Sequence, residues 1–120
     1  MRRRVGLLLA VGLLAVALSA VGVASASQGA TKAKTVTVGM YELKFVLSAK
    51  VVPKGTVVFR VANKGKLPHD FKIAGKKTAL VAPGKSATLR VKIAKKGRLG
   101  YLCTVPGHAA AGMKGVFTAR

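Results

Sequence analysis

The amino-acid sequence predicts an all-β fold, a sandwich of two packed sheets, for residues 35–120. Apolar and polar residues alternate with a period of two along most of this region, as expected for strands with one buried face. Turn-forming residues interrupt the alternation about every 8–12 residues, which is typical of antiparallel sandwiches. No part of this region has the pattern of a long amphipathic helix. We therefore expect about seven to eight short strands around one modest core.

The N-terminus predicts a signal peptide over residues 1–26. Residues 2–4 are three arginines, residues 5–23 are almost wholly apolar, and Ala-Ser-Ala at 24–26 fits the small-residue cleavage rule. The apolar span is nearly long enough to cross a bilayer, so a retained membrane anchor is the alternative. Residues 27–34 are small and polar and form a short tether. We expect an exported protein, located in the periplasm or secreted, and membrane-anchored if the leader is retained.

The first half of the domain contains three expected strands. Residues 35–40 and 42–47 both alternate, but the phase slips by one residue near Tyr41, which suggests a bulge or a crossing between sheets. Glu42 is expected to face away from the core. A turn at residues 53–55 precedes the third strand. The side chains expected to point inward are Val36, Val38, Met40, Leu43, Phe45, Leu47, Val57, Phe59 and Val61.

The second half contains a short expected strand over residues 69–73 and the clearest alternation of the chain over 86–93. Turns at residues 82–85 and 95–97 bound the longer of these strands. A final strand is expected over residues 114–119. The side chains expected to point inward, the thiol included, are Ala87, Leu89, Val91, Ile93, Leu99, Tyr101 and Cys103.

The chain is strongly basic, with a net charge of +20 at pH 7 and two acidic residues. Without the three leader arginines the net charge is +17. A charge of this size predicts attraction to acidic proteins and to anionic membrane surfaces. Lysines on strands and turns also protect sheet edges from pairing with other chains, which is a simpler explanation for part of the charge. Few aromatic residues and no arginine-rich helix argue against nucleic-acid binding.

One segment collects the residues that carry chemistry. Cys103, which is the only cysteine, His108 and Met113 follow one another at intervals of five residues, with no charged residue between them. The other histidine, His69, lies upstream after a proline. Taken singly, a buried cysteine, a structural histidine and a packed methionine have ordinary explanations. Together, a thiolate, two imidazoles and a thioether predict one metal site, and this soft donor set suits copper.

Three segments resemble the cupredoxins, the type 1 blue-copper family that includes plastocyanins and rusticyanins. They are Leu-Pro-His-Asp-Phe over 67–71, Tyr-Leu-Cys-Thr-Val-Pro-Gly-His over 101–108 and Gly-Met-Lys-Gly over 112–115. The similarity runs from about residue 35 to the end of the chain. It implies a Greek-key β-sandwich with copper at one end. The spacing of the last loop is longer than in plastocyanins and is more similar to rusticyanin-type loops.

The resemblance also implies roles for individual residues. The ligands that it implies for one copper ion, Cu(I) or Cu(II), are His69, Cys103 and His108 in equatorial positions and Met113 in the axial position. Where many cupredoxins have asparagine, this chain has Asp70. Its carboxylate would accept a hydrogen bond from Thr104, brace the two copper loops and favour the oxidised metal. An aspartate that caps its own turn is the alternative.

The predicted site favours a one-electron carrier and not an enzyme. Four protein ligands leave no open position for a substrate, and two histidines are enough for one site of this type. We expect a monomer that exchanges electrons with acidic redox proteins, such as a cytochrome or a membrane oxidase or reductase. The uncharged span 105–113 predicts a docking face around His108.

Two other functions and one other metal remain open at this point. A copper-sequestering or delivery protein could use the same fold without carrying electrons. A copper oxidase or reductase would need further histidines from a partner chain. Zinc could bind the cysteine and histidines, although methionine is a poor zinc ligand.

Overall fold

The computed structural model describes residues 32–120, together with Gly12 and Gly22. Apart from these two glycines, the expected signal peptide and most of the expected tether lie outside the described residues. Among the residues described, no helix is long and apolar enough to cross a membrane. The strands of this part of the chain are β1 (Lys34–Tyr41), β2 (Lys44–Leu47), β3 (Val51–Val52), β4 (Gly55–Asn63), β5 (Lys72–Ile73), β6 (Lys76–Lys77), β7 (Ser86–Ile93), β8 (Gly97–Leu102) and β9 (Lys114–Ala119).

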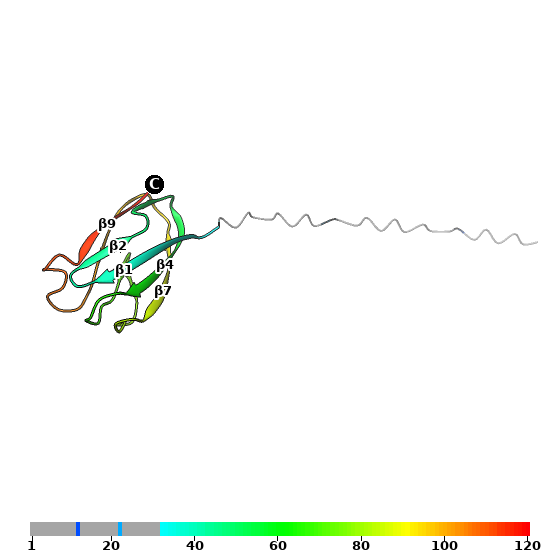
Figure 1. Ribbon diagram of the computed structural model, residues 1–120. Coiled ribbons are helices and arrows are strands. Elements are labelled where there is room, and N and C mark those ends of the chain that lie inside the picture. The colour runs from blue at the N-terminus through cyan, green and yellow to red at the C-terminus, as the bar shows by residue number, and fades with distance from the viewer. Residues whose placement is uncertain (1–11, 13–21, 23–31) are drawn as a thin grey trace, which may run out of the picture.

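The strands form the two sheets of the predicted sandwich (Figure 1). One sheet has the order β2-β1-β4-β7 and the other the order β3-β9-β8-β5-β6. The expectation of purely antiparallel sheets is wrong for two pairs, because β1 with β4 and β3 with β9 are parallel. The chain crosses from β2 to β3 in the opposite sheet before it returns to β4, and such a crossover brings β4 beside β1 in the same direction.

The core contains the expected inward faces except for Leu43, which lies on the turn between β1 and β2 and is exposed. Alternate side chains of β1, β4, β7 and β8 are buried or half-buried between the sheets. Removing this apolar surface from water stabilises the sandwich by about 25 cal/mol per Å². Neighbouring aromatic rings at the centre have centroids between 5.2 Å and 5.7 Å apart. These rings belong to Phe45, Phe59, Phe71, Tyr101 and Phe117.

The phase slip near Tyr41 is a tight turn, so the expected bulge or sheet crossing is wrong. β1 and β2 pair as an antiparallel hairpin in which Tyr41 faces Lys44, with only Glu42 and Leu43 between them. Leu43 has a φ of 61°, in the left-handed region that Gly or Asn usually occupies in such turns. Glu-Leu lacks this sequence signal, which explains the error. The turn places Glu42 at the end of the sandwich and not on a strand face.

The short strand expected over residues 69–73 is only partly present. β5 covers the last two of these residues, and His69 instead forms an isolated bridge with Val81. The N–H of Phe71 donates to the hydroxyl of Thr78 at 3.1 Å, and the N–H of Thr78 donates to the carbonyl of Phe71 at 3.0 Å. A side-chain contact thus replaces a ladder hydrogen bond, and the regular strand is interrupted there.

Three chain segments meet at one end of the sandwich. They are the turn between β1 and β2, residues 64–71 after β4, here called the His69 loop, and residues 103–113 between β8 and β9, here called the Cys103 loop. In Figure 1 the orange Cys103 loop lies at the end of the sandwich toward which β1 runs. The carbonyl of Leu43 lies 3.7 Å from the position that a Cβ on Gly112 would take, so the turn and this loop are in contact.

Candidate metal centre

Side chains from the two long loops converge at this end of the sandwich. One ligand atom from each of His69, Cys103 and His108 lies within 4.8 Å of the others. The Nδ1 atoms of the two histidines are 3.1 Å apart, and the Cys103 sulfur lies 3.7 Å from Nδ1 of His108. His69 and Cys103 are buried, whereas His108 is partly exposed. The site is therefore sealed inside the protein except on the His108 side.

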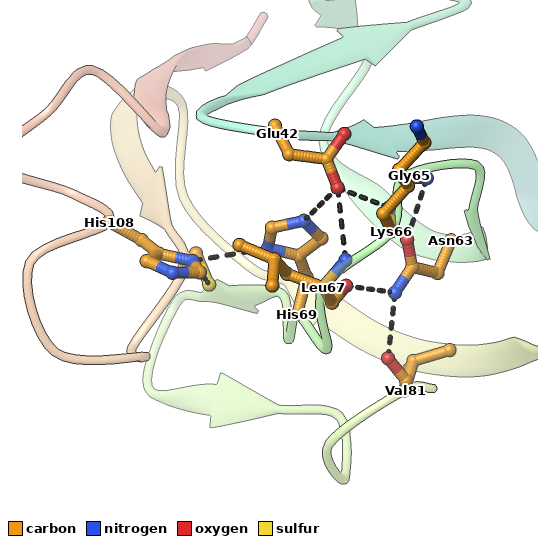
Figure 2. A network of polar contacts seen from close by, with 9 residues as sticks. Glu42, Asn63, Gly65, Lys66, Leu67, His69, Val81 and His108 are labelled. Carbon is orange, nitrogen blue, oxygen red and sulfur yellow. Dashed lines mark hydrogen bonds and ion pairs between the residues drawn. The ribbon is translucent and has the colours of Figure 1, made fainter. Parts of the chain in front are cut away.

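Main-chain hydrogen bonds fix the position of His69. Its N–H donates to the carbonyl of Val81 at 3.2 Å, and the N–H of Val81 donates back at 2.8 Å. The buried Asn63 amide donates to the carbonyls of Leu67 and Val81 at 2.8 Å and 2.9 Å (Figure 2). Asn63 thus ties the end of β4 to the segment that precedes His69 and to Val81, the residue that pairs with His69.

The Cys103 loop is closed at its base by Met113. The N–H of Cys103 donates to the carbonyl of Met113 at 3.1 Å, and the N–H of Met113 donates to the carbonyl of His108 at 3.0 Å. Met113 is fully buried. Gly107 and Gly112 have φ values of 83° and 115°, so they supply left-handed backbone at the turns of this loop. The loop thereby presents three donor residues from one short segment, and the axial role of Met113 stays a prediction.

Asp70 makes the contact that the sequence predicts. The N–H of Thr104 donates to Oδ1 of Asp70 at 2.6 Å, and the hydroxyl of Thr104 donates to Oδ2. Asp70 is 4% exposed, so both hydrogen bonds form largely away from water. They join the His69 loop to the Cys103 loop, and a role limited to capping one turn does not explain them.

The donor set fits a copper ion. The converging thiol and imidazoles, and the thioether of the buried Met113 at the base of the same loop, are soft or borderline ligands, and the two imidazole Nδ1 atoms lie 3.1 Å apart. In the described part of the chain, the converging group contains no carboxylate. Hard cations such as Mg²⁺ and Ca²⁺ prefer oxygen ligands, so this site does not suit them.

Comparison with known proteins decides the family. The sequence matches the family model of the cupredoxin-like domain over residues 11–119. The chain belongs to the cupredoxin family. The four residues His69, Cys103, His108 and Met113 form the cluster typical of a type 1 copper site in this family.

Individual relatives of this cupredoxin are copper proteins. It is 49% identical over 41 residues to the copper-resistant cuproprotein CopI of Pseudomonas aeruginosa, a match that covers 34% of this chain and 23% of that protein. CopI of Vibrio cholerae is 27% identical over 93 residues, which cover 60% of this chain and 55% of that protein. The cupredoxin thus spans about half the length of these curated relatives, or less.

The fold also matches solved structures. Dithionite-reduced auracyanin from the photosynthetic bacterium Roseiflexus castenholzii has a TM-score of 0.66 and 25% sequence identity to this cupredoxin. The match covers 72% of this chain and 97% of the auracyanin chain. The two-sheet sandwich of cupredoxin type is therefore confirmed.

Sequence reasoning missed one residue at the site, Glu42. Its Oε1 accepts hydrogen bonds from the N–H groups of Lys66 and Leu67, the second at 3.0 Å, and it lies 3.9 Å from Nε2 of His69. The two backbone donors hold the pKa of Glu42 below its usual value. Two signals in the sequence pointed to this residue: it is one of the two acidic residues of the chain, and it sits at the phase slip.

Burial shifts the pKa values of the two buried donors, His69 and Cys103, in opposite directions. The pKa of His69 is lowered, first by burial and then by the positive charge that His108 would carry. Burial raises the pKa of the Cys103 thiol. Without metal, His69 is therefore neutral and Cys103 protonated at pH 7. A metal that binds the thiolate must displace this proton, so binding strengthens as the pH rises.

The copper-free protein is expected to be most stable between about pH 6.5 and pH 9. Below the ordinary histidine pKa of 6.5 the unfolded chain takes up a proton that folded His69 resists, so the free energy of unfolding falls. Above the ordinary thiol pKa of 9.0 the unfolded chain loses a proton that folded Cys103 retains, and it falls again. Thermal unfolding across this range measures both effects, and about 1 kcal/mol corresponds to about 4–8 °C in Tm. If Cys103→Ser and the unmodified protein lose the same amount of Tm at alkaline pH, the alkaline loss of stability is not due to the Cys103 thiol.

Replacing Asp70 with asparagine is expected to raise the reduction potential of the copper-loaded protein. The substitution keeps the shape of the side chain but removes a negative charge that favours Cu(II). At several ångströms and an effective dielectric of about 20, one charge is worth on the order of 1–2 kcal/mol, or roughly 40–80 mV for one electron. A redox titration followed by absorbance measures the shift. Ala94→Lys, which adds the same unit of charge at the distant β7–β8 turn, is the control, and equal shifts in both would contradict a local effect.

Proposed function

We propose that this cupredoxin is an exported one-electron carrier whose copper is held by His69, Cys103, His108 and Met113. One observation carries the proposal: a sealed soft donor set has a single imidazole, that of His108, at the surface. Copper, when bound, would supply a one-electron couple between Cu(I) and Cu(II). An electron can reach it through an imidazole at the surface, while solvent and substrates are kept from the buried donors.

The chain's own residues hold the donors in place in several independent ways. The hydrogen bonds from Thr104 to Asp70 fix the distance between the two loops, and Asn63 fixes the backbone around His69. Donors held by such contacts move little when the charge of the site changes, which suits a carrier that must be both reduced and oxidised. With four protein donors no position is left for a substrate, so we propose no enzymatic activity.

The surface around His108 supports a docking role. Leu43 and Leu67 are exposed by 41% and 48%, and Ala110 is exposed beside the histidine. We call these three residues, with His108, the docking face. Exposed lysines follow Leu43 and precede Leu67 in the sequence, so positive charge borders the apolar residues. A small apolar face with a basic rim suits brief contact with an acidic redox protein.

Electron exchange with a redox partner tests the proposal. The copper-loaded protein should have an intense thiolate-to-copper absorption band that bleaches with ascorbate and returns with an oxidant. Ala110→Glu should keep this band but slow electron exchange by roughly tenfold, because a charge now has to be desolvated in the docking face. Ala94→Glu makes the same change in an exposed residue of the distant β7–β8 turn and is the control.

Three outcomes would contradict parts of the proposal. A band that cannot be cycled by reductant and oxidant would exclude the carrier function. Equal slowing in both variants would show that overall charge, and not the docking face, governs the encounter. Unchanged exchange in Ala110→Glu would place the route of the electron elsewhere.

A second candidate function is copper sequestration or delivery in the exported compartment. The names of the two CopI relatives favour it, because both are called copper-resistant cuproproteins. The deciding measurement is whether copper or only an electron leaves the protein. Transfer of copper to an acceptor chelator on the timescale of electron exchange would favour delivery, whereas a retained ion that cycles between its two oxidation states would favour the carrier.

A further inference from the structure

The acidic residues of this basic chain are both at the metal centre. The sequence contains two of them, and Asp70 already has a role between the two loops. The other, Glu42, lies on the two-residue turn between β1 and β2, with its side chain 43% exposed. An exposed carboxylate on a turn usually faces water alone. Glu42 instead reaches across to the His69 loop.

A single oxygen of Glu42 makes all of the contacts. Its Oε1 accepts hydrogen bonds from the N–H groups of Lys66 and Leu67 and lies 3.9 Å from Nε2 of His69 (Figure 2). These partners lie more than twenty residues after Glu42 in the sequence. The carboxylate therefore joins the β1–β2 turn to the His69 loop. Its partner Leu67 lies only two residues before the histidine.

Gly65 provides the space for this carboxylate. A Cβ on Gly65 would overlap Oε1 of Glu42, and it would lie 2.9 Å from the carboxyl carbon and 3.0 Å from Oε2. Gly65 is not among the positive-φ glycines, so its backbone does not require glycine. The N–H of Gly65 is held by the side-chain oxygen of Asn63 at 2.9 Å, which keeps the loop in place around the carboxylate.

The contact matters because of which nitrogen of His69 carries the proton. Nδ1 of His69 faces Nδ1 of His108 and the metal position, whereas Nε2 is buried and has no hydrogen-bond partner among the described residues. A neutral imidazole has one N–H, and only the other nitrogen can donate its lone pair to a metal. A carboxylate at 3.9 Å is too distant for a hydrogen bond, but its charge favours the proton on Nε2.

We propose that Glu42 is a positioning residue for His69. It fixes the His69 loop through Lys66 and Leu67 and holds the ring in the tautomer that leaves Nδ1 free for the metal. Carboxylates beside ligating histidines commonly have this role in metal sites. The inference rests on the proposed function only in taking His69 as a copper ligand.

Three variants separate the parts of this role. Glu42→Gln keeps an oxygen that can accept the same two backbone hydrogen bonds. Glu42→Ala removes it, and Gly65→Ala displaces the carboxylate without changing any charge. Gly100→Ala is the control, because Gly100 lies on β8 with open space around its Cβ position and no positive φ. All four are compared with the unmodified full-length chain.

Two measurements are made on each protein. The first is the nitrogen-15 spectrum of the His69 ring in the copper-free state, at a pH above about 7, where the two tautomers have different chemical shifts. The second is the Cu(I) dissociation constant, from competition with a chelator. We expect Glu42→Ala and Gly65→Ala to mix the two tautomers and to weaken Cu(I) binding about 10- to 100-fold. We expect Glu42→Gln to keep Cu(I) binding close to that of the unmodified protein, because it keeps the two backbone hydrogen bonds, but to mix the tautomers, because it lacks the charge. We expect Gly100→Ala to resemble the unmodified protein in both measurements.

The proposal is overturned if the His69 tautomer stays the same in both Glu42→Ala and Gly65→Ala. It is also overturned if Glu42→Gln keeps the tautomer of the unmodified protein, since the charge of Glu42 would then not set that tautomer. The loop-fixing part is overturned if Glu42→Gln weakens Cu(I) binding as much as Glu42→Ala does, since an accepting oxygen would then not restore the position of the loop. An unmodified protein that fails to bind copper would contradict the proposed function alone, because the tautomer is read in the copper-free state. A folding defect confined to Glu42→Ala leaves Gly65→Ala, with its intact carboxylate, as the deciding variant.

Discussion

Replacing Cys103 with serine is expected to abolish the thiolate-to-copper absorption band while the β-sandwich stays folded. The band requires a thiolate bound to copper, and Cys103 is the only cysteine of the chain. Serine is similar in size, so the 1%-exposed position keeps most of its packing. A buried hydroxyl without a full set of partners costs on the order of 1–3 kcal/mol, which lowers Tm without unfolding the domain. Absorbance of the copper-loaded protein and thermal unfolding of the copper-free protein measure the two effects.

Ala119→Ser is the matched control for the buried hydroxyl. Ala119 is 2% exposed and lies at the end of β9 far from the Cys103 loop, so this variant should lose a comparable amount of stability and keep the band. An intense band in Cys103→Ser would end the assignment of a type 1 copper site. Loss of the band in both variants would show that the site responds to stability and not to the thiolate.

Electron exchange with an acidic partner is expected to be fast at low salt and to slow by 10-fold or more as salt is added. The net charge of +20, or +17 if the expected leader is removed, would steer an acidic protein toward the surface and can raise association rates by about 10–10³-fold. Salt screens this attraction, since the Debye length is about 8 Å at physiological ionic strength. Stopped-flow absorbance at several salt concentrations, with one acidic and one basic test partner, measures the effect.

Two lysine variants show whether the position of the charge matters. Lys66→Gln removes a charge beside the docking face, and Lys95→Gln removes the same charge from the distant β7–β8 turn. A larger decrease in rate for Lys66→Gln would support steering toward His108, and equal decreases would assign the attraction to the net charge. Rates that are equal for both partners and independent of salt would show that the lysines do not attract a partner and serve only solubility and the protection of sheet edges.

Much of the fold was open to prediction because its signals are local. Alternation along residues 36–40 or 57–61 reflects the period of a strand with one buried face, and that period needs no knowledge of the partner strand. The donor residues were open to prediction for a similar reason. Cysteine, histidine and methionine within one uncharged segment report their chemistry through residue type and spacing.

The bracing contact between Asp70 and Thr104 lay at the limit of what a sequence can predict. The resemblance to cupredoxins implied one hydrogen bond, and the tertiary structure has two, one to each carboxylate oxygen. Which atoms donate depends on how closely two loops 34 residues apart approach each other. That distance follows from the packing of the sheets beneath the loops.

The sequence by itself determined the longer strands, most of their inward faces and the soft donor set, because each of these is a property of residue type and local spacing. Only the tertiary structure decided the parallel pairing of β1 with β4, the turn in place of a bulge, and the contact of Glu42 with the His69 loop. The turn depends on a positive φ at Leu43, a conformation that a leucine side chain does not signal. Glu42 could not be assigned because its partners lie on a segment that the crossover through the second sheet brings beside it.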